Sequence, residues 1–136
     1  MNASQGFFEV WSPRVLSVLR IVTGLLFMQY GSAKLFHIPH VAMFDNLHLM
    51  SLLGIQGVLE LGGGLLLLIG LFSRPVAFVL SGDMAVAYFM AHWPRSWLPI
   101  LNGGDLAVLF CFVFLHLWAA GPGPWSIDMR LRRKAY

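Results

Sequence analysis

The chain has 136 residues, of which 58% are hydrophobic and only 11% are charged. Soluble domains carry about 25% charged residues, so this composition excludes an ordinary soluble enzyme and indicates an integral membrane protein. The formal net charge is +3. Much of the positive charge lies near the C-terminus, as expected of a tail beside a membrane, and does not indicate nucleic-acid binding. Cys111 is the only cysteine, which excludes an intrachain disulfide and a C-x-x-C redox pair.

Four stretches have the length and composition of membrane-spanning helices, which need about 20 apolar residues. They are residues 15–36, 49–72, 75–93 and 103–120. The first is expected to be a retained helix rather than a cleaved signal peptide, because Arg20 interrupts its apolar run. The sequence therefore predicts one all-α domain over residues 1–136. Its fold class is an integral membrane four-helix bundle, followed by a basic tail at residues 121–136.

Proline and glycine positions predict where the helices begin and end. Ser12-Pro13 and Ser73-Arg74-Pro75 are typical helix starts, with a capping serine and an early proline. Gly121-Pro122-Gly123-Pro124 is expected to end the fourth helix. A weak internal repeat is also present, because an offset of 62 residues places Pro13 on Pro75 and an offset of 45 places Glu60 on Asp105. This repeat favours two similar helical hairpins packed on each other.

The distribution of basic residues predicts the orientation of the bundle. Four spans place both termini on one side of the membrane. The basic residues on that side are Arg14, Arg74, Arg130, Arg132, Arg133 and Lys134, whereas Lys34 and Arg95 lie on the other. Because cytoplasmic segments carry the excess of lysine and arginine, we expect both termini in the cytoplasm.

Ionisable residues inside apolar spans are expensive, and they often pair with one another or mark functional sites. Arg20 and Asp83 lie at similar distances from Pro13 and Pro75, about 10 to 12 Å at the helical rise of about 1.5 Å per residue. The sequence therefore predicts that Arg20 and Asp83 form an ion pair. Such a pair is either a structural brace or part of a site.

Glu60 is the strongest candidate for a functional residue. No basic residue is expected at its depth, and Gly62-Gly63-Gly64 follows it closely. Glycines let helix backbones approach each other in membranes. Two interpretations stay open. Glu60 is a protonated or hydrogen-bonded residue in a packed helix contact, or it lies beside a cavity where a flat ring or headgroup meets a proton-exchanging carboxyl group.

The remaining polar candidates belong to the outer half of the bundle, namely Gln29, His92, Asn102 and Asp105. Asn102-Gly103-Gly104-Asp105 has the form of a helix start, with Asn102 as the capping amide and Asp105 in the first turn. His92 is either a proton donor and acceptor at the outer mouth or an ordinary helix end. No metal site is expected, because the histidine spacing around His37 and His40 matches no zinc pattern.

Nearly the whole chain resembles the DoxX family of small four-helix bacterial membrane proteins. The matching stretches are LRIVTGLLFMQYGSAKLF, ELGGGLLLLIGLFSRPVAF, SGDMAVAYFMAHWPR, LNGGDLAVLFCFVFL and GPGPWSID. Some members have glutamate where this chain has Asp83 and Asp105. The aspartates keep the negative charge, but their side chains are shorter and reach less far. The resemblance implies a four-helix bundle in the bacterial cytoplasmic (inner) membrane. It also implies an oxidoreductase role, linked through partner subunits to quinone-dependent sulfur or thiol oxidation.

The expected function is therefore that of an inner-membrane oxidoreductase subunit. It would bind a quinone or another lipophilic ligand within the bundle and act with a redox partner, with a homo-oligomer also allowed. Glu60 and His92 are the expected catalytic residues, which would handle protons. The expected polar network comprises Arg20, Gln29, Asp83, Asn102 and Asp105. The alternative is a non-enzymatic membrane scaffold or assembly factor, in which the polar network specifies the fold.

Overall fold

The computed structural model describes residues 3–135, and these form helices joined by loops and turns. The α-helices are α1 (Ala3–Phe36), α2 (Leu52–Ile69), α3 (Ser73–Ala87), α4 (Pro99–Asn102), α5 (Asp105–Ala120) and α6 (Ile127–Lys134). A 3-10 turn, η1 (Ala42–Phe44), lies in the connection after α1, and a π-helical turn, η2 (Tyr88–His92), extends α3. The predicted all-α fold class is confirmed.

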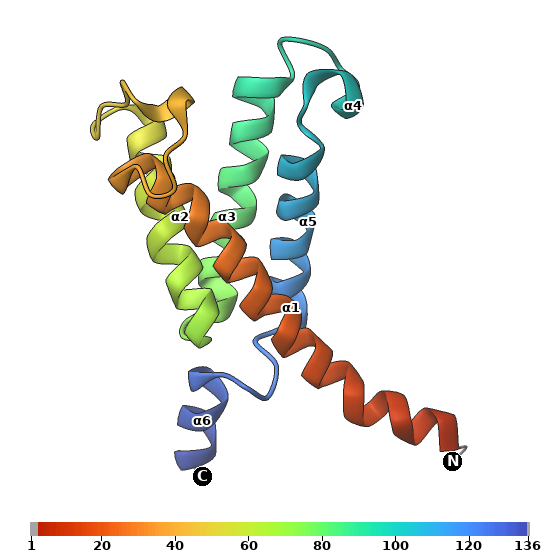
Figure 1. The fold of residues 1–136 in the computed structure, drawn as a ribbon. Coiled ribbons are helices and arrows are strands. Elements are labelled where there is room, and N and C mark those ends of the chain that lie inside the picture. Colours follow the sequence, from red (N-terminus) through yellow and green to blue (C-terminus); the bar gives the residue numbers. More distant parts are fainter. Residues whose placement is uncertain (1–2, 136) are drawn as a thin grey trace.

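Three helical segments are long and apolar enough to cross a membrane, namely Ser4–Phe36, Leu52–Ile69 and Ser73–His92. The fourth, α5, is equally apolar but has 16 residues. Helices α1 and α2 pack along each other, as do α3 and α5, while contacts between α2 and α3 are fewer. The bundle is thus built from two helical hairpins, as the internal repeat predicted (Figure 1).

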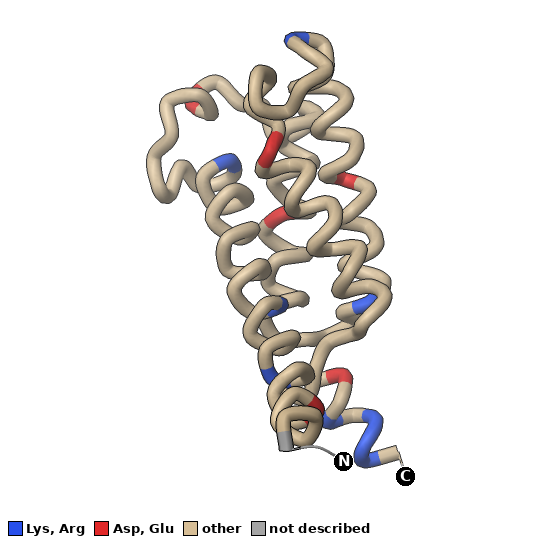
Figure 2. The backbone as a smooth tube through the Cα atoms, turned by 90° about the vertical axis from the view of Figure 1, so that its right-hand side faces the viewer, with Lys and Arg blue, Asp and Glu red and all other residues tan. Residues whose placement is uncertain are grey.

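The two ends of the bundle differ in character. One end holds the start of α1, the turn between α2 and α3, and α6; we call it the tail end (Figure 1). The opposite end holds the connection at residues 37–51 and the connection at residues 93–104; we call it the loop end. The tail end carries the basic residues of α6 (Figure 2).

The start of the first helix differs from the sequence prediction. The helix was expected to begin at Ser12-Pro13, but α1 begins at Ala3 and contains Pro13 in its interior. A proline lacks one N–H donor, and here the helical bonds on either side are sufficient to carry the helix through it. One turn further on, the hydroxyl of Ser17 donates a 3.3 Å hydrogen bond to the carbonyl of Pro13.

Glycines allow α1 and α2 to approach closely. A Cβ atom added to Gly31 would lie 2.7 Å from the carbonyl oxygen of Gly57, and one added to Gly24 would lie 2.8 Å from that of Gly64. Such small residues are typical of membrane helix contacts. The prediction for the triple glycine is only partly right, because Gly62 faces open space.

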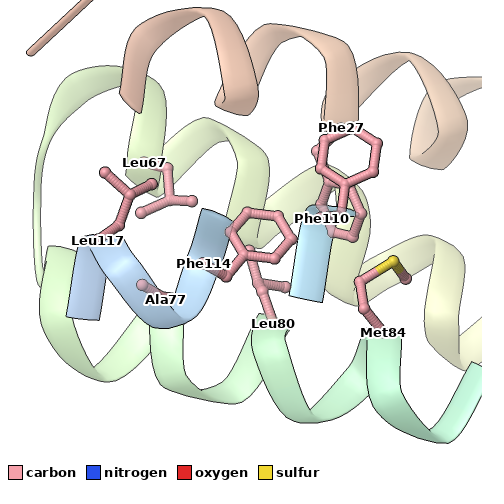
Figure 3. Close-up of a cluster of buried hydrophobic side chains, with 8 residues drawn as sticks. All are labelled: Phe27, Leu67, Ala77, Leu80, Met84, Phe110, Phe114 and Leu117. Carbon is pink, nitrogen blue, oxygen red and sulfur yellow. The ribbon is translucent and has the colours of Figure 1, made fainter. Parts of the chain in front are cut away.

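An apolar core joins the two hairpins (Figure 3). Phe27 of α1 and Phe114 of α5 have ring centroids 4.8 Å apart in an edge-to-face arrangement, which favours aromatic pairs. Leu67 of α2 and Leu80 of α3 complete the contact among the four long helices. This core lies between the two polar regions described below.

Candidate functional site

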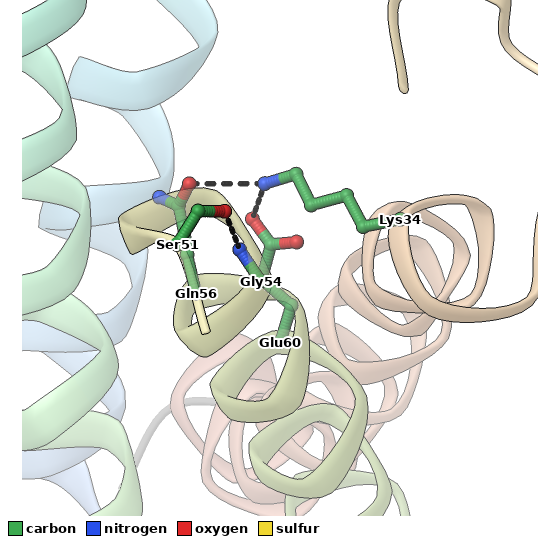
Figure 4. A network of polar contacts seen from close by, with 5 residues as sticks. All are labelled: Lys34, Ser51, Gly54, Gln56 and Glu60. Carbon is green, nitrogen blue, oxygen red and sulfur yellow. Dashed lines mark hydrogen bonds and ion pairs between the residues drawn. The ribbon is translucent and has the colours of Figure 1, made fainter. Parts of the chain in front are cut away.

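A buried ion pair joins α1 to α2 toward the loop end. Nζ of Lys34 lies 2.8 Å from Oε1 of Glu60, and the two side chains are only 5% and 3% exposed. The same ammonium donates a 3.0 Å hydrogen bond to Oε1 of Gln56, one helical turn before Glu60 (Figure 4). Lys34 therefore bridges two acceptors that project from the same face of α2.

Asp83 of α3 extends this pair into a group drawn from three helices. Its carboxylate is close enough to interact electrostatically with Lys34 and with the side chain of Gln56. We call Lys34, Gln56, Glu60 and Asp83 the polar cluster. One oxygen of each carboxylate, Oε2 of Glu60 and Oδ2 of Asp83, is buried without a hydrogen-bond partner in the described structure. Because unsatisfied buried acceptors are costly, the cluster can accept a proton or a further hydrogen-bond donor.

This arrangement corrects the sequence analysis in one respect. Glu60 was expected to have no basic residue at its depth, and that expectation is wrong because Lys34 is bonded to it. Lys34 lies two residues before the end of α1 and Glu60 lies eight residues after the start of α2, so the long side chain of Lys34 extends along the bundle to reach the carboxylate.

Arg20 lies at the tail end and does not pair with Asp83, so the predicted brace is also wrong. Its guanidinium donates a 2.8 Å hydrogen bond to the carbonyl of Leu67, a 2.6 Å bond to that of Trp125, and a third bond to that of Pro122. Arg20 is 1% exposed. Helix ends leave carbonyl groups without partners, and the forked guanidinium satisfies carbonyls of α2 and of the GPGPWSID segment together.

The GPGPWSID segment, residues 121–128, also forms hydrogen bonds with the start of α3. The two carboxylate oxygens of Asp128 each accept a 2.9 Å hydrogen bond, one from the backbone N–H of Phe72 and the other from that of Ser73. A carboxylate at this position is favourable at a helix N-terminus. Arg20 and Asp128 thus tie α1, α2 and α3 to this segment.

Asn102 organises the loop end between η2 and α5. Its amide nitrogen donates a 2.8 Å hydrogen bond to the carbonyl of Ser96, and its amide oxygen accepts a 2.7 Å bond from the N–H of Gly104. Nδ1 of His92 lies 3.0 Å from the Asn102 carbonyl oxygen. Asn102 is the last residue of α4 rather than the cap of α5, whose capping residue is Gly104. Asp105 is in the first turn of α5, as expected.

An apolar pocket of about 330 Å³ lies between α1, the η1 segment and α5. Gln29 and Tyr30 of α1, Phe44 of η1, and Leu106 and Phe110 of α5 are among its lining residues. Phe44 is buried, and the ammonium of Lys34 lies 5.6 Å from the centroid of its ring. Phe44 therefore contacts both the apolar pocket and the polar cluster, which makes the two features neighbours.

The structure thus divides the predicted site residues into three groups. Glu60 and Asp83 belong to the polar cluster, with Gln29 in the adjacent pocket. His92 and Asn102 contact each other at the loop end, with Asp105 nearby in sequence, and Arg20 lies at the tail end. Sequence reasoning missed Lys34, Gln56 and Phe44. Within residues 3–135, no three His, Cys, Asp or Glu side chains are placed to hold a metal ion.

Comparisons with known proteins give the relationships of the chain. Residues 15–93 match the model of the DoxX family. An uncharacterized protein of Haemophilus influenzae is 37% identical over 93% of this chain and 97% of its own length. An uncharacterized membrane protein of Mycobacterium tuberculosis is 30% identical over 90% of this chain and 85% of its own. The Escherichia coli inner membrane protein YqjF is 27% identical over 86% and 92%. No solved structure matches the chain.

Proposed function

Because the chain belongs to the DoxX family of membrane proteins, we propose that it binds a quinone or a similar lipophilic ring within its bundle and serves as an oxidoreductase subunit. The observation that carries this proposal is the buried polar cluster beside the apolar pocket of about 330 Å³. Small-molecule sites usually have this combination, in which apolar walls hold a ligand and a few polar groups orient it.

The polar cluster suits a ring with hydroxyl or carbonyl oxygens. The free oxygens of Glu60 and Asp83 accept hydrogen bonds, and a hydroquinone offers hydroxyl donors, whereas a quinone carbonyl accepts a bond from Lys34. If both carboxylates are ionised, the cluster has two negative charges and one positive charge, which favours uptake of a proton in an apolar environment. Gln29 and Tyr30 add polar atoms to the pocket wall.

The proposed reaction needs an external source of electrons. Reduction of a quinone to its hydroquinone consumes two electrons and two protons, and the lone Cys111 offers no dithiol to supply electrons. A partner protein with its own redox group supplies them. Glu60 passes both protons to the two ring oxygens, one after the other. It is reprotonated from the loop end, where His92, held beside the carbonyl of Asn102, exchanges protons with water.

We further propose that the chain lies in the bacterial inner membrane with its tail end in the cytoplasm. The Escherichia coli relative is described as an inner membrane protein. The basic residues of α6, in its last turn Arg132, Arg133 and Lys134, lie at the tail end. Cytoplasmic segments next to membrane helices carry such an excess of positive charge.

A binding titration tests the proposal. The purified chain in detergent is titrated with a short-chain benzoquinone while tryptophan fluorescence is followed. We expect saturable quenching, with affinity at least tenfold weaker in Glu60→Gln and in Leu106→Trp, which narrows the pocket. Asp105→Asn is the matched control, since Asp105 is exposed and outside the cluster. The absence of a saturable component in the unmodified chain would disprove quinone binding. Equal affinity in Glu60→Gln would disprove the role of Glu60.

The alternative function is that of a non-enzymatic scaffold or assembly factor. It is favoured by the position of Lys34, which binds two side chains of α2 and so specifies how α1 packs on α2. Affinity capture from native membranes distinguishes the two functions. A stoichiometric partner without a redox group, together with no quinone binding, would support the scaffold.

A further inference from the structure

A second pocket, of about 440 Å³, lies at the tail end of the bundle. Ile69 at the end of α2 forms one wall, and Trp125, Met129, Arg130 and Arg133 form the other. It contains none of the residues of the polar cluster, and its lining is far more basic than that of the apolar pocket. It therefore needs a separate explanation.

Within the part of the chain that the structure describes, no ion pair neutralises the positive charge at this pocket. Among residues 3–135 the ion pairs are Lys34–Glu60 and His40–Asp45, so neither Arg130 nor Arg133 has a carboxylate partner. The one acidic residue of α6 is Asp128, and both of its carboxylate oxygens accept hydrogen bonds from backbone N–H groups at the start of α3.

Helix α6 is fixed in place rather than loosely attached. The N–H of Asp128 donates a 2.9 Å hydrogen bond to the carbonyl of Gly70, and the hydroxyl of Ser126 caps the helix through a 3.2 Å bond from the N–H of Met129. Arg130 and Arg133 are three residues apart and so share one face of the helix. Both arginines therefore extend from one face of α6 and line the same pocket.

The pocket changes from apolar to basic with distance from the membrane-spanning helices. Ile69 belongs to the end of α2, and α6 leads away from the bundle beyond it (Figure 1). Trp125, which precedes α6 in the chain, also lines the pocket, and tryptophan is typical of the interface between lipid and water. A phospholipid changes from apolar to charged in the same direction, from acyl chains through glycerol to phosphate. The forked guanidinium group of an arginine can donate two parallel hydrogen bonds to one phosphate group.

We propose that this pocket binds one anionic phospholipid. Arg130 and Arg133 hold its phosphate, and the acyl-chain segments next to the glycerol lie against Ile69 and Trp125. The inference does not depend on quinone binding, because it uses a different pocket at the other end of the bundle. The occupant is a lipid of the surrounding leaflet rather than a soluble anion, since the wall formed by Ile69 and Trp125 suits glycerol and acyl chains.

The test uses the full chain in nanodiscs of phosphatidylcholine with a small fraction of either dibromo-phosphatidylglycerol or dibromo-phosphatidylcholine. Bromine quenches nearby tryptophan, and subtracting the signal of Trp125→Phe isolates Trp125. We expect phosphatidylglycerol to be enriched roughly fivefold or more over phosphatidylcholine at Trp125. The attraction of one basic residue near the membrane surface for an anionic lipid already gives an enrichment of about this size. The variant Arg130→Gln/Arg133→Gln should lose this enrichment. The matched control Arg132→Gln/Lys134→Gln removes the same charge from outside the pocket lining and should retain most of it.

Three results would overturn the proposal. The first is equal quenching of Trp125 by the two brominated lipids in the unmodified chain. The second is an equal loss of enrichment in both double variants, which would show attraction to the whole tail rather than to a site. The third is displacement of the lipid by inorganic phosphate at constant ionic strength, which would show a site for a soluble anion.

Discussion

The ammonium nitrogen of Lys34 lies 2.8 Å from Oε1 of Glu60, although the residues are 26 positions apart and belong to two apolar helices. A buried ion pair sets the register of the elements that it joins, because any slip leaves two charges unpaired in a medium of low polarity. In this protein the pair also lies beside an apolar pocket, with Phe44 between them. The same contact therefore bears both on folding and on the proposed ligand binding.

Removing Lys34 should destabilise the bundle more than removing the whole pair. Lys34→Met leaves the carboxylate of Glu60 buried without its counter-charge, and we expect the free energy of unfolding to fall by about 3 kcal/mol. The double variant Lys34→Met/Glu60→Gln should recover much of that loss. Denaturant unfolding in mixed micelles measures both. If Lys34→Met behaves like the exposed control Lys134→Met, the ion pair contributes nothing to stability.

Arg20 should act through backbone carbonyls and not through Asp83. Arg20→Gln loses most of three hydrogen bonds made by a charged donor, each worth about 1.5 to 3 kcal/mol and not additive, so we expect a loss of about 3 kcal/mol. The charge exchange Arg20→Asp/Asp83→Arg should be less stable than either single variant. Thermal unfolding in detergent gives the comparison. If the exchange variant instead recovers stability, Arg20 and Asp83 interact directly, as the sequence predicted, and the role assigned to the backbone carbonyls is wrong.

The close contact of α1 with α2 should not tolerate a single methyl group. Gly31→Ala places a Cβ atom 2.7 Å from the carbonyl oxygen of Gly57, so the helices must separate, and we expect a loss of about 2 kcal/mol. Gly82→Ala is the matched control, because its Cβ would meet nothing within 4 Å and alanine favours helix by about 1 kcal/mol. Unfolding midpoints of the two variants should therefore move in opposite directions. A stabilised Gly31→Ala would contradict the helix contact.

Asp128 should matter for the start of α3 although it lies 55 residues further along the chain than Ser73. Asp128→Ala removes the acceptor for the N–H groups of Phe72 and Ser73, and we expect a loss of about 1 to 2 kcal/mol. Hydrogen exchange at these two amides should accelerate by about tenfold, the factor that corresponds to 1.4 kcal/mol. Glu9→Ala, an exposed change in α1, is the control. Unchanged exchange at Phe72 and Ser73 would show that another group caps α3.

The helices themselves were predictable from the sequence. The expected spans 49–72, 75–93 and 103–120 correspond to α2, α3 with η2, and α5, with limits that differ by a few residues. Hydrophobic length is a local property, so composition alone determines which segments suit a bilayer. The first helix was the exception, because Ser12-Pro13 has the form of a helix start and nevertheless lies inside α1.

The candidate site was only partly predictable. Glu60 and Asp83 were identified because charged residues are rare in apolar spans, and the structure places both in the polar cluster. Their partner Lys34 was missed although it lies within the predicted span 15–36, because it was counted only as a basic residue of one membrane side, whereas the structure buries it against Glu60.

The composition and pattern of the chain were sufficient to establish a membrane bundle, its helices and the unusual charges within them. Which charges meet was decided only by the tertiary structure. Residue counts give the approximate height of a side chain along its own helix. They do not give the rotation of that helix, its tilt or its neighbours. Arg20 and Lys34 lie on one helix, yet the first binds carbonyl groups at the tail end and the second binds Glu60, because α1 crosses α2 at glycine contacts that only the packed structure defines.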